Sequence, residues 1–145
     1  MAIWHSAVDI ERVNAMQAGT INEVLGIRIT DIGEDSVTGT MPVDGRTHQP
    51  MGILHGGASV VLAESLGSMA GNLCVDRSQC YCVGLDINAN HLRSVRSGLV
   101  TGVARPIHLG RTTQVWDIRL SDEAGKPVCI ARLTLAVISH NRPSA

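Results

Sequence analysis

One stretch of this chain, residues 55–73, restricts the possible folds more than any other. It is the only segment long and apolar enough for a long buried helix, and its side chains are apolar or small on nearly every side. A helix without a wide polar face must be buried over most of its surface. Small residues such as Gly57, Gly67 and Gly71 allow other backbone segments to approach closely. The rest of the chain must therefore be built around one central helix.

Alternation of apolar and polar residues predicts β-strands on both sides of this helix. Residues 26–31 and 36–43 form a predicted hairpin, which follows a short amphipathic helix over Asp9–Met16. Four further strands are predicted at 81–92, 99–107, 112–120 and 126–138, and their short connections favour antiparallel pairing. We expect an α+β fold, a curved antiparallel sheet of about six strands wrapped around the helix. This single domain covers residues 1–145, with a loosely attached tail at 139–145.

Composition excludes several classes of function. Hydrophobic residues make up 44% and charged residues 17% of the chain, which argues against disorder. A net charge of -1 gives no overall attraction to nucleic acid or a membrane surface, and 2% aromatic residues cannot build base-stacking platforms. No apolar run is long enough to cross a bilayer. An acid-containing N-terminal segment and four cysteines without a C-x-x-C pair predict a reduced, cytoplasmic protein.

Glu64 is the residue that most suggests chemistry, because it is the only charge within the apolar helix. Burying a carboxylate among aliphatic side chains is costly, so such a residue has a partner or a function. From the residues alone, a structural acid paired with an arginine explains Glu64 as well as a catalytic acid does. Ser68 lies four positions later on the same helical face, where it can hold a water molecule or orient the carboxylate.

The helix begins with His55-Gly56-Gly57. Free backbone N–H groups at a helix N-terminus, together with the helix dipole, stabilise a developing oxyanion. At Gly56 a substrate carbonyl can approach closely, because no side chain intervenes. Taken alone, the glycine pair is better explained as a tight junction between loop and helix, and His55 as a capping residue is a second interpretation.

Several sequence blocks occur in an order that resembles one enzyme family. The blocks are Met41-Pro42-Val43-Asp44, Gln49-Pro50, Gly52-Ile53-Leu54-His55-Gly56-Gly57-Ala58-Ser59, Ala63-Glu64-Ser65 and Asn88-Ala89-Asn90-His91. With the order of predicted elements, they resemble the hotdog-fold acyl-CoA thioesterases over Ile10 to Ile138. Within that family the chain is similar to the bacterial enzymes that act on aryl-CoA or acyl-CoA thioesters in menaquinone (1,4-dihydroxy-2-naphthoyl-CoA) and enterobactin pathways. The resemblance implies hydrolysis of such a thioester to the free acid and CoA.

The resemblance also implies roles for individual residues. Glu64 matches the general base or nucleophile, with Ser68 one turn later, and the amide of Gly56 polarises the thioester carbonyl. Gln49 and His55 assist in positioning that carbonyl. The segments expected to contact CoA are His91-Leu92-Arg93-Ser94 and His108-Leu109-Gly110-Arg111. Enzymes of this family form homodimers that often pair into homotetramers.

An arginine-rich stretch supports the CoA assignment from the residues themselves. No acid lies between Asp86 and Asp117, whereas this stretch contains four arginines. Arginine suits phosphate oxygens, and CoA carries a diphosphate and a 3′-phosphate. A solvated basic surface explains the same charges equally well. For the acyl group we expect Met51, Leu66 and Met69 near the pocket, with core filling as the alternative role of the methionines.

Helix geometry predicts a site shared between two chains. Glu64 follows Gly56 by eight residues, which separates them by roughly 12 Å along one helix. One chain therefore cannot bring both groups to the same carbonyl. We expect a homodimer with its sites at the subunit interface and, by resemblance, a homotetramer.

Two alternative functions remain open from the sequence. One is a hotdog hydratase or dehydratase, although the nine-residue spacing of His55 and Glu64 favours hydrolysis. The other is a non-catalytic module that binds acyl-CoA or an acyl-carrier protein, and such a carrier is also an alternative thioester donor. The histidines and cysteines lack metal-ligand spacing, and no phosphate-binding glycine loop occurs. We therefore expect no metal and no cofactor, CoA being part of the substrate.

Overall fold

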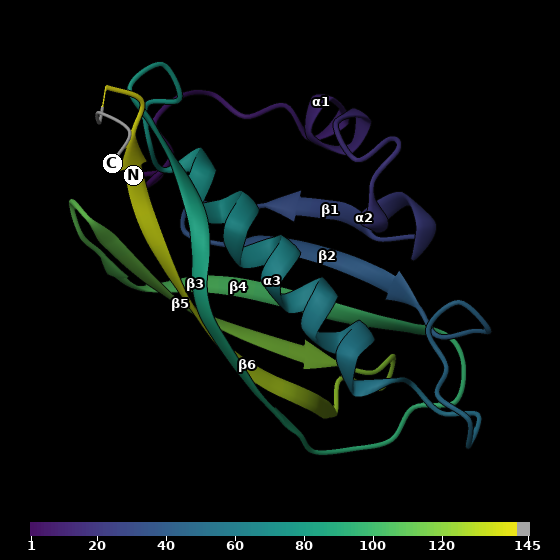
Figure 1. Cartoon of the computed structure of the whole chain (residues 1–145). Coiled ribbons are helices and arrows are strands. Elements are labelled where there is room, and N and C mark those ends of the chain that lie inside the picture. Colours follow the sequence, from purple (N-terminus) through teal and green to yellow (C-terminus); the bar gives the residue numbers. More distant parts are fainter. Residues whose placement is uncertain (142–145) are drawn as a thin grey trace.

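Helix α3 (Gly56–Leu73) crosses one face of a curved six-stranded antiparallel sheet, which confirms the predicted fold class (Figure 1). The structure is a computed structural model that describes residues 1–141. The strands lie in the order β1-β2-β4-β5-β6-β3. Their bounds are β1 Arg28–Ile32, β2 Val37–Pro42, β3 Cys80–His91, β4 Leu99–Leu109, β5 Thr113–Ser121 and β6 Pro127–Ser139.

Two glycines allow α3 to lie close to the sheet. Gly39 of β2 and Gly102 of β4 are register partners in neighbouring strands. A β-carbon on Gly39 or Gly102 would come within 2.8 Å or 2.6 Å of a δ-carbon of Leu66. The sheet therefore has a hollow at this point, and the Leu66 side chain fills it with 0% exposure. Removing a leucine side chain from water in this way stabilises a fold by roughly 1.5–3 kcal/mol.

Two short helices precede the sheet, where the sequence predicted one. Helix α1 (Ile10–Ala15) begins after Asp9, whose carboxylate accepts hydrogen bonds from two amides of the first turn. Helix α2 (Ile21–Val24) was not predicted, because four residues are too few to show a helical period. Asn22 of α2 accepts a hydrogen bond from the hydroxyl of Ser65 at 2.8 Å, which ties this segment to α3.

Strand β3 forms an edge of the sheet, because β6 is the only strand of residues 1–141 that pairs with it. Within these residues, one side of the 12-residue strand is a long row of backbone groups without a neighbouring strand. Val83 and Leu85 on this strand are 42% and 62% exposed. The pairing with β6 changes register between Gly84 and Asp86, so Leu85 is an extra residue and forms a β-bulge.

The predicted loose tail is wrong for its first residues. Strand β6 continues to Ser139, and the amide of His140 donates a hydrogen bond to the carbonyl of Gln79 at 3.0 Å. The ring of His140 lies 5.2 Å from that of Tyr81, measured between ring centroids. The chain is therefore held against its neighbours as far as His140, past residue 138, where the last strand was predicted to end. Residues 142–145 of the predicted tail lie outside the described residues.

We expect Leu66→Ala to lower the free energy of unfolding by about 2–5 kcal/mol, because the hollow between the two glycines would become a cavity. Urea denaturation followed by circular dichroism measures this change. Val24→Ala is the control, since Val24 is 65% exposed and its truncation should change stability by less than about 0.5 kcal/mol. Equal losses for the two variants would show that Leu66 does not anchor α3.

Candidate active site

A cavity of about 390 Å³ opens at the N-terminus of α3. It lies where the end of β3 and the loop before α3 meet the first turn of the helix. Its lining consists of Gln49, Ile53, Leu54, Gly56, Ser59, His91, Leu92, Arg93, Ser94 and Val128. The structure thus brings together five residues that the sequence predicted for the site, namely Gln49, Gly56, His91, Arg93 and Ser94.

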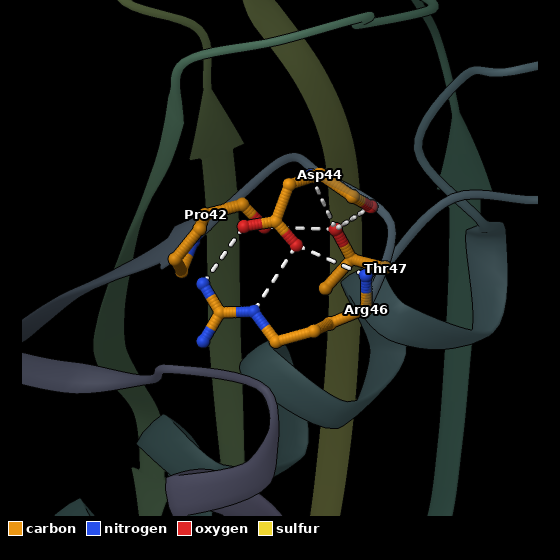
Figure 2. A network of polar contacts seen from close by, with 4 residues as sticks. All are labelled: Pro42, Asp44, Arg46 and Thr47. Atoms are coloured by element: carbon orange, nitrogen blue, oxygen red, sulfur yellow. Dashed lines mark hydrogen bonds and ion pairs between the residues drawn. The ribbon is translucent and has the colours of Figure 1, made fainter.

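The loop that carries Gln49 is held by a network of polar contacts (Figure 2). Asp44 and Arg46 form an ion pair with 2.7 Å between Oδ2 and Nη2. Hydrogen bonds from the Arg46 side chain and backbone lower the pKa of Asp44 to about 2, so this carboxylate is ionised at neutral pH. The buried hydroxyl of Thr47 donates to the carbonyl of Pro42 at 2.8 Å. The loop therefore has a defined shape before any ligand binds.

Backbone contacts extend this order from Thr47 to Gln49 and to the start of α3. The amide of His55 donates to the carbonyl of Thr47 at 2.8 Å, and the amide of Gln49 donates to the carbonyl of Ile53 at 2.9 Å. The side-chain oxygen of Gln49 accepts a hydrogen bond from the amide of Met51. Gln49 is consequently placed at the cavity by the loop that precedes the helix.

His91 packs directly against Gly56. A β-carbon on Gly56 would lie 2.8 Å from Nε2 of His91, so only glycine leaves room for the ring here. His55 has a different position from the one expected of a carbonyl-positioning residue. Its Nδ1 accepts a hydrogen bond from the amide of Gly57 at 2.8 Å, which makes His55 the N-cap of α3, and it does not line the cavity.

Glu64 lies two turns further along α3, outside the cavity. At 1.5 Å per residue, the eight residues between it and Gly56 correspond to roughly 12 Å. Glu64 is half-buried, and its Oε1 lies above the backbone of Gly84 in β3. Ser68 is half-buried one turn later on the same face. The chain therefore keeps Gly56 and Glu64 apart, as helix geometry predicts.

The two predicted CoA-binding segments lie at opposite ends of α3. His91 to Ser94 lie at its N-terminus, beside the cavity. His108, Gly110 and Arg111 belong to the hairpin that joins β4 to β5. This hairpin lies at the left in Figure 1, toward the C-terminal end of α3. Just after it, the side chain of Gln114 in β5 donates a hydrogen bond to the carbonyl of Gly71 near the end of α3 at 3.4 Å. One chain does not bring the two segments to one ligand.

The three residues proposed for the acyl pocket are also dispersed. Leu66 is fully buried between the glycines of the sheet, whereas Met51 is 78% exposed. Met69 is half-buried against the core. It follows Glu64 by five residues, which turns it about 140° around the helix axis from the carboxylate. Leu66 therefore belongs to the core of this chain, whereas Met69 contacts the core and stays a predicted pocket residue.

Sequence reasoning did not propose Ser59 and Val128 as cavity residues. Ser59 had a usable signal, since it follows Gly56 by three residues and so lies on the same side of the first turn. No pattern in the sequence around Val128 marks it as a cavity residue. It reaches the cavity because β6 pairs with β3, where the carbonyl of Val128 accepts a hydrogen bond from the amide of Leu92 at 2.8 Å.

Three of the four cysteines are poor nucleophiles at neutral pH, because burial raises the pKa of their thiols. All four are free thiols, and burial raises the pKa of Cys74 to about 12 and that of Cys82 to about 11. Burial also raises the pKa of Cys129. Within residues 1–141, no three His, Cys, Asp or Glu side chains gather as metal ligands. Over the same residues, no helix combines the length and apolar character needed to cross a membrane.

The pattern that defines the thioesterase superfamily matches residues 51–129, more than half of the 145 residues. The chain belongs to the thioesterase superfamily. It is therefore a thioester hydrolase, and this family membership favours hydrolysis over the hydratase and the non-catalytic binding module.

Relatives of this thioesterase cover nearly the whole chain. The 1,4-dihydroxy-2-naphthoyl-CoA hydrolase of Escherichia coli strain K12 is 54% identical over 136 residues, which cover 94% of this chain and 99% of that protein. The proofreading thioesterase EntH of Cronobacter turicensis is 52% identical over 136 residues, with 94% and 98% coverage. The crystal structure of a variant of thioesterase PA1618 from Pseudomonas aeruginosa has a TM-score of 0.94 at 64% identity, covering 95% of this chain and 99% of that one.

Proposed function

We propose that this thioesterase hydrolyses aryl-CoA and acyl-CoA thioesters at sites shared by two subunits, with Gly56 from one subunit and Glu64 from the other. One observation carries the proposal: the cavity at the N-terminus of α3 contains Gly56 but not Glu64. The substrate class is supported by the relative that is a 1,4-dihydroxy-2-naphthoyl-CoA hydrolase. An aromatic acyl group on CoA is accordingly our first choice of substrate.

The thioester carbonyl binds at the first turn of α3. The amide of Gly57 donates its hydrogen bond to the side chain of His55. The amide of Gly56, a residue that lines the cavity, has no partner within the helix. Together with the positive end of the helix dipole, this amide stabilises negative charge on the carbonyl oxygen. Gln49, which also lines this cavity, orients the acyl group.

Glu64 of the second subunit acts as the general base. Its carboxylate takes a proton from water, and the resulting hydroxide bonds to the carbonyl carbon. The tetrahedral oxyanion accepts a hydrogen bond from the amide of Gly56 and then re-forms the carbonyl as the C–S bond breaks. The protonated Glu64 returns its proton to the leaving thiolate, so the products are a free acid and CoA. Ser68, one turn from Glu64, orients the carboxylate or the water.

The exposed edge of the sheet supports a dimer. In the part of the chain that the structure describes, the 12 residues of β3 have no neighbouring strand on one side, and this strand carries the exposed side chains of Val83 and Leu85. Long apolar edge strands are normally covered. A second copy related by a two-fold axis covers this edge with its own β3 and places its α3 antiparallel to the first. We propose this homodimer, and a homotetramer formed from two such dimers, as the functional assembly.

The CoA moiety binds beside the cavity. His91, Arg93 and Ser94 border it, and Arg93 supplies a positive charge for the phosphates. His108, Gly110 and Arg111 lie too far away along the same chain, so we assign them to CoA bound at another subunit's site. We further propose that the enzyme works in the cytoplasm without metal or cofactor. CoA is the preferred thioester donor, and an acyl-carrier protein is the alternative.

Glu64→Gln should lower kcat by at least about 10²-fold with little change in KM, because it removes the base and keeps the shape of the side chain. Release of free thiol from a panel of aromatic, β-keto and straight-chain acyl-CoA substrates measures this. Glu11→Gln is the matched control, because the side chain of Glu11 is 81% exposed on α1. Near-normal turnover by Glu64→Gln would contradict the assigned role.

Mixed dimers test whether the site is shared. Glu64→Ala and Gly56→Leu homodimers should each retain at most about 1% of wild-type kcat. Refolding the two subunits together gives hybrids in which one site has both native groups. With equal subunits, about one quarter of wild-type activity should return. Native mass spectrometry confirms that hybrids have formed. If the hybrids stay as inactive as either parent, Gly56 and Glu64 act within one chain.

Arg93→Ala should raise KM roughly tenfold for a CoA thioester and leave KM for the matching pantetheine thioester nearly unchanged, because only CoA carries the nucleotide phosphates. Arg96→Ala is the control, since Arg96 is three residues away and does not line the cavity. Equal effects of Arg93→Ala on both substrates would mean that this side chain does not bind the nucleotide.

A further inference from the structure

Gly84 of β3 lies directly beneath the carboxylate of Glu64. A β-carbon on Gly84 would be 2.6 Å from Oε1 of Glu64, whereas Cδ1 of Leu133 would be 4.0 Å away. Gly84 does not have a positive φ, so its backbone conformation does not require glycine. Glycine matters at this position because it has no side chain, which leaves space for the carboxylate of Glu64.

A second contact holds the helix against the same part of the strand. The side-chain amide of Asn72 donates to the carbonyl of Cys82 at 3.1 Å, and the amide of Cys82 donates to Oδ1 of Asn72 at 3.0 Å. This pair of hydrogen bonds fixes α3 relative to β3 two residues before Gly84. The distance between the helix that carries Glu64 and the strand beneath it is therefore set locally.

The bulge at Leu85 then determines which side chains of β3 face the helix. Gly84 faces Glu64 and His91 faces Gly56, although they are seven residues apart. In a regular strand, residues an odd number apart point to opposite faces. The extra residue at Leu85 changes this alternation, so both positions face α3.

We propose that Gly84 is a positioning residue for catalysis: the space above its α-carbon, held by the Asn72 contact and the bulge at Leu85, fixes the Glu64 carboxylate for its reaction with water. This inference rests on the proposed role of Glu64 as the base. It predicts that a single methyl group at Gly84 displaces the flexible end of Glu64 without disturbing the rest of the fold.

The test is a double-mutant cycle of Gly84→Ala and Glu64→Ala. In the wild-type background, Gly84→Ala should lower kcat by roughly 10- to 10²-fold with an unchanged KM, as expected for a small misplacement of a catalytic group. In the Glu64→Ala background, which has no carboxylate to displace, Gly84→Ala should leave the residual kcat unchanged. Gly45→Ala is the matched control, because a β-carbon there would meet no atom within 4 Å.

Each outcome is decisive. An unchanged kcat for Gly84→Ala, an effect confined to KM, or equal losses in both backgrounds would overturn the inference. Equal losses in both backgrounds would point instead to a disturbed subunit interface. The native mass of each variant shows whether the dimer still forms. If Gly84→Ala does not fold, recovery of folding in the double variant supports the contact, and its failure overturns it. Near-normal turnover by Glu64→Ala alone would instead refute the proposed function.

Discussion

The position of every group proposed for catalysis depends on how closely α3 can approach the sheet. Gly39 and Gly102 leave a hollow that the side chain of Leu66 enters, and this contact lies near the middle of the helix. Because an α-helix is rigid over 18 residues, anchoring its middle also places its ends. Its first turn then lies beside the end of β3, and Glu64 lies above Gly84. Burial of aliphatic side chains thus sets distances that the chemistry requires.

The features that could be predicted from the sequence have local signals. The central helix follows from an uninterrupted run of apolar and small residues, and the strands follow from alternation. The separation of Gly56 and Glu64 follows from the rise of a helix alone. Gln49, His91 and Arg93 were assigned to the site through the family resemblance, and the fold brings them to one cavity with Gly56.

The features that could not be predicted depend on pairing between distant parts of the chain. The bulge at Leu85 exists only relative to β6, and Val128 reaches the cavity only through that pairing. His55 shows a different difficulty, because capping and carbonyl positioning both suit a histidine before a helix, and only the structure shows that its side chain makes the capping contact. The split of the CoA segments depends on strand length: β4 runs for 11 residues away from the cavity end before the hairpin at His108 to Arg111.

The bulge at Leu85 determines which side chains of β3 face α3 on either side of it. On its near side the inward positions include Cys82 and Gly84, and beyond it they are Ile87, Ala89 and His91. Substitutions along the exposed side of this strand preserve the alternation of inward and outward side chains. Loss or gain of one residue between Gly84 and His91 would exchange the inward and outward side chains for half of the strand, whereas a change of two residues would restore the alternation. Substitutions at outward positions of this segment should therefore be tolerated more readily than the insertion or deletion of one residue.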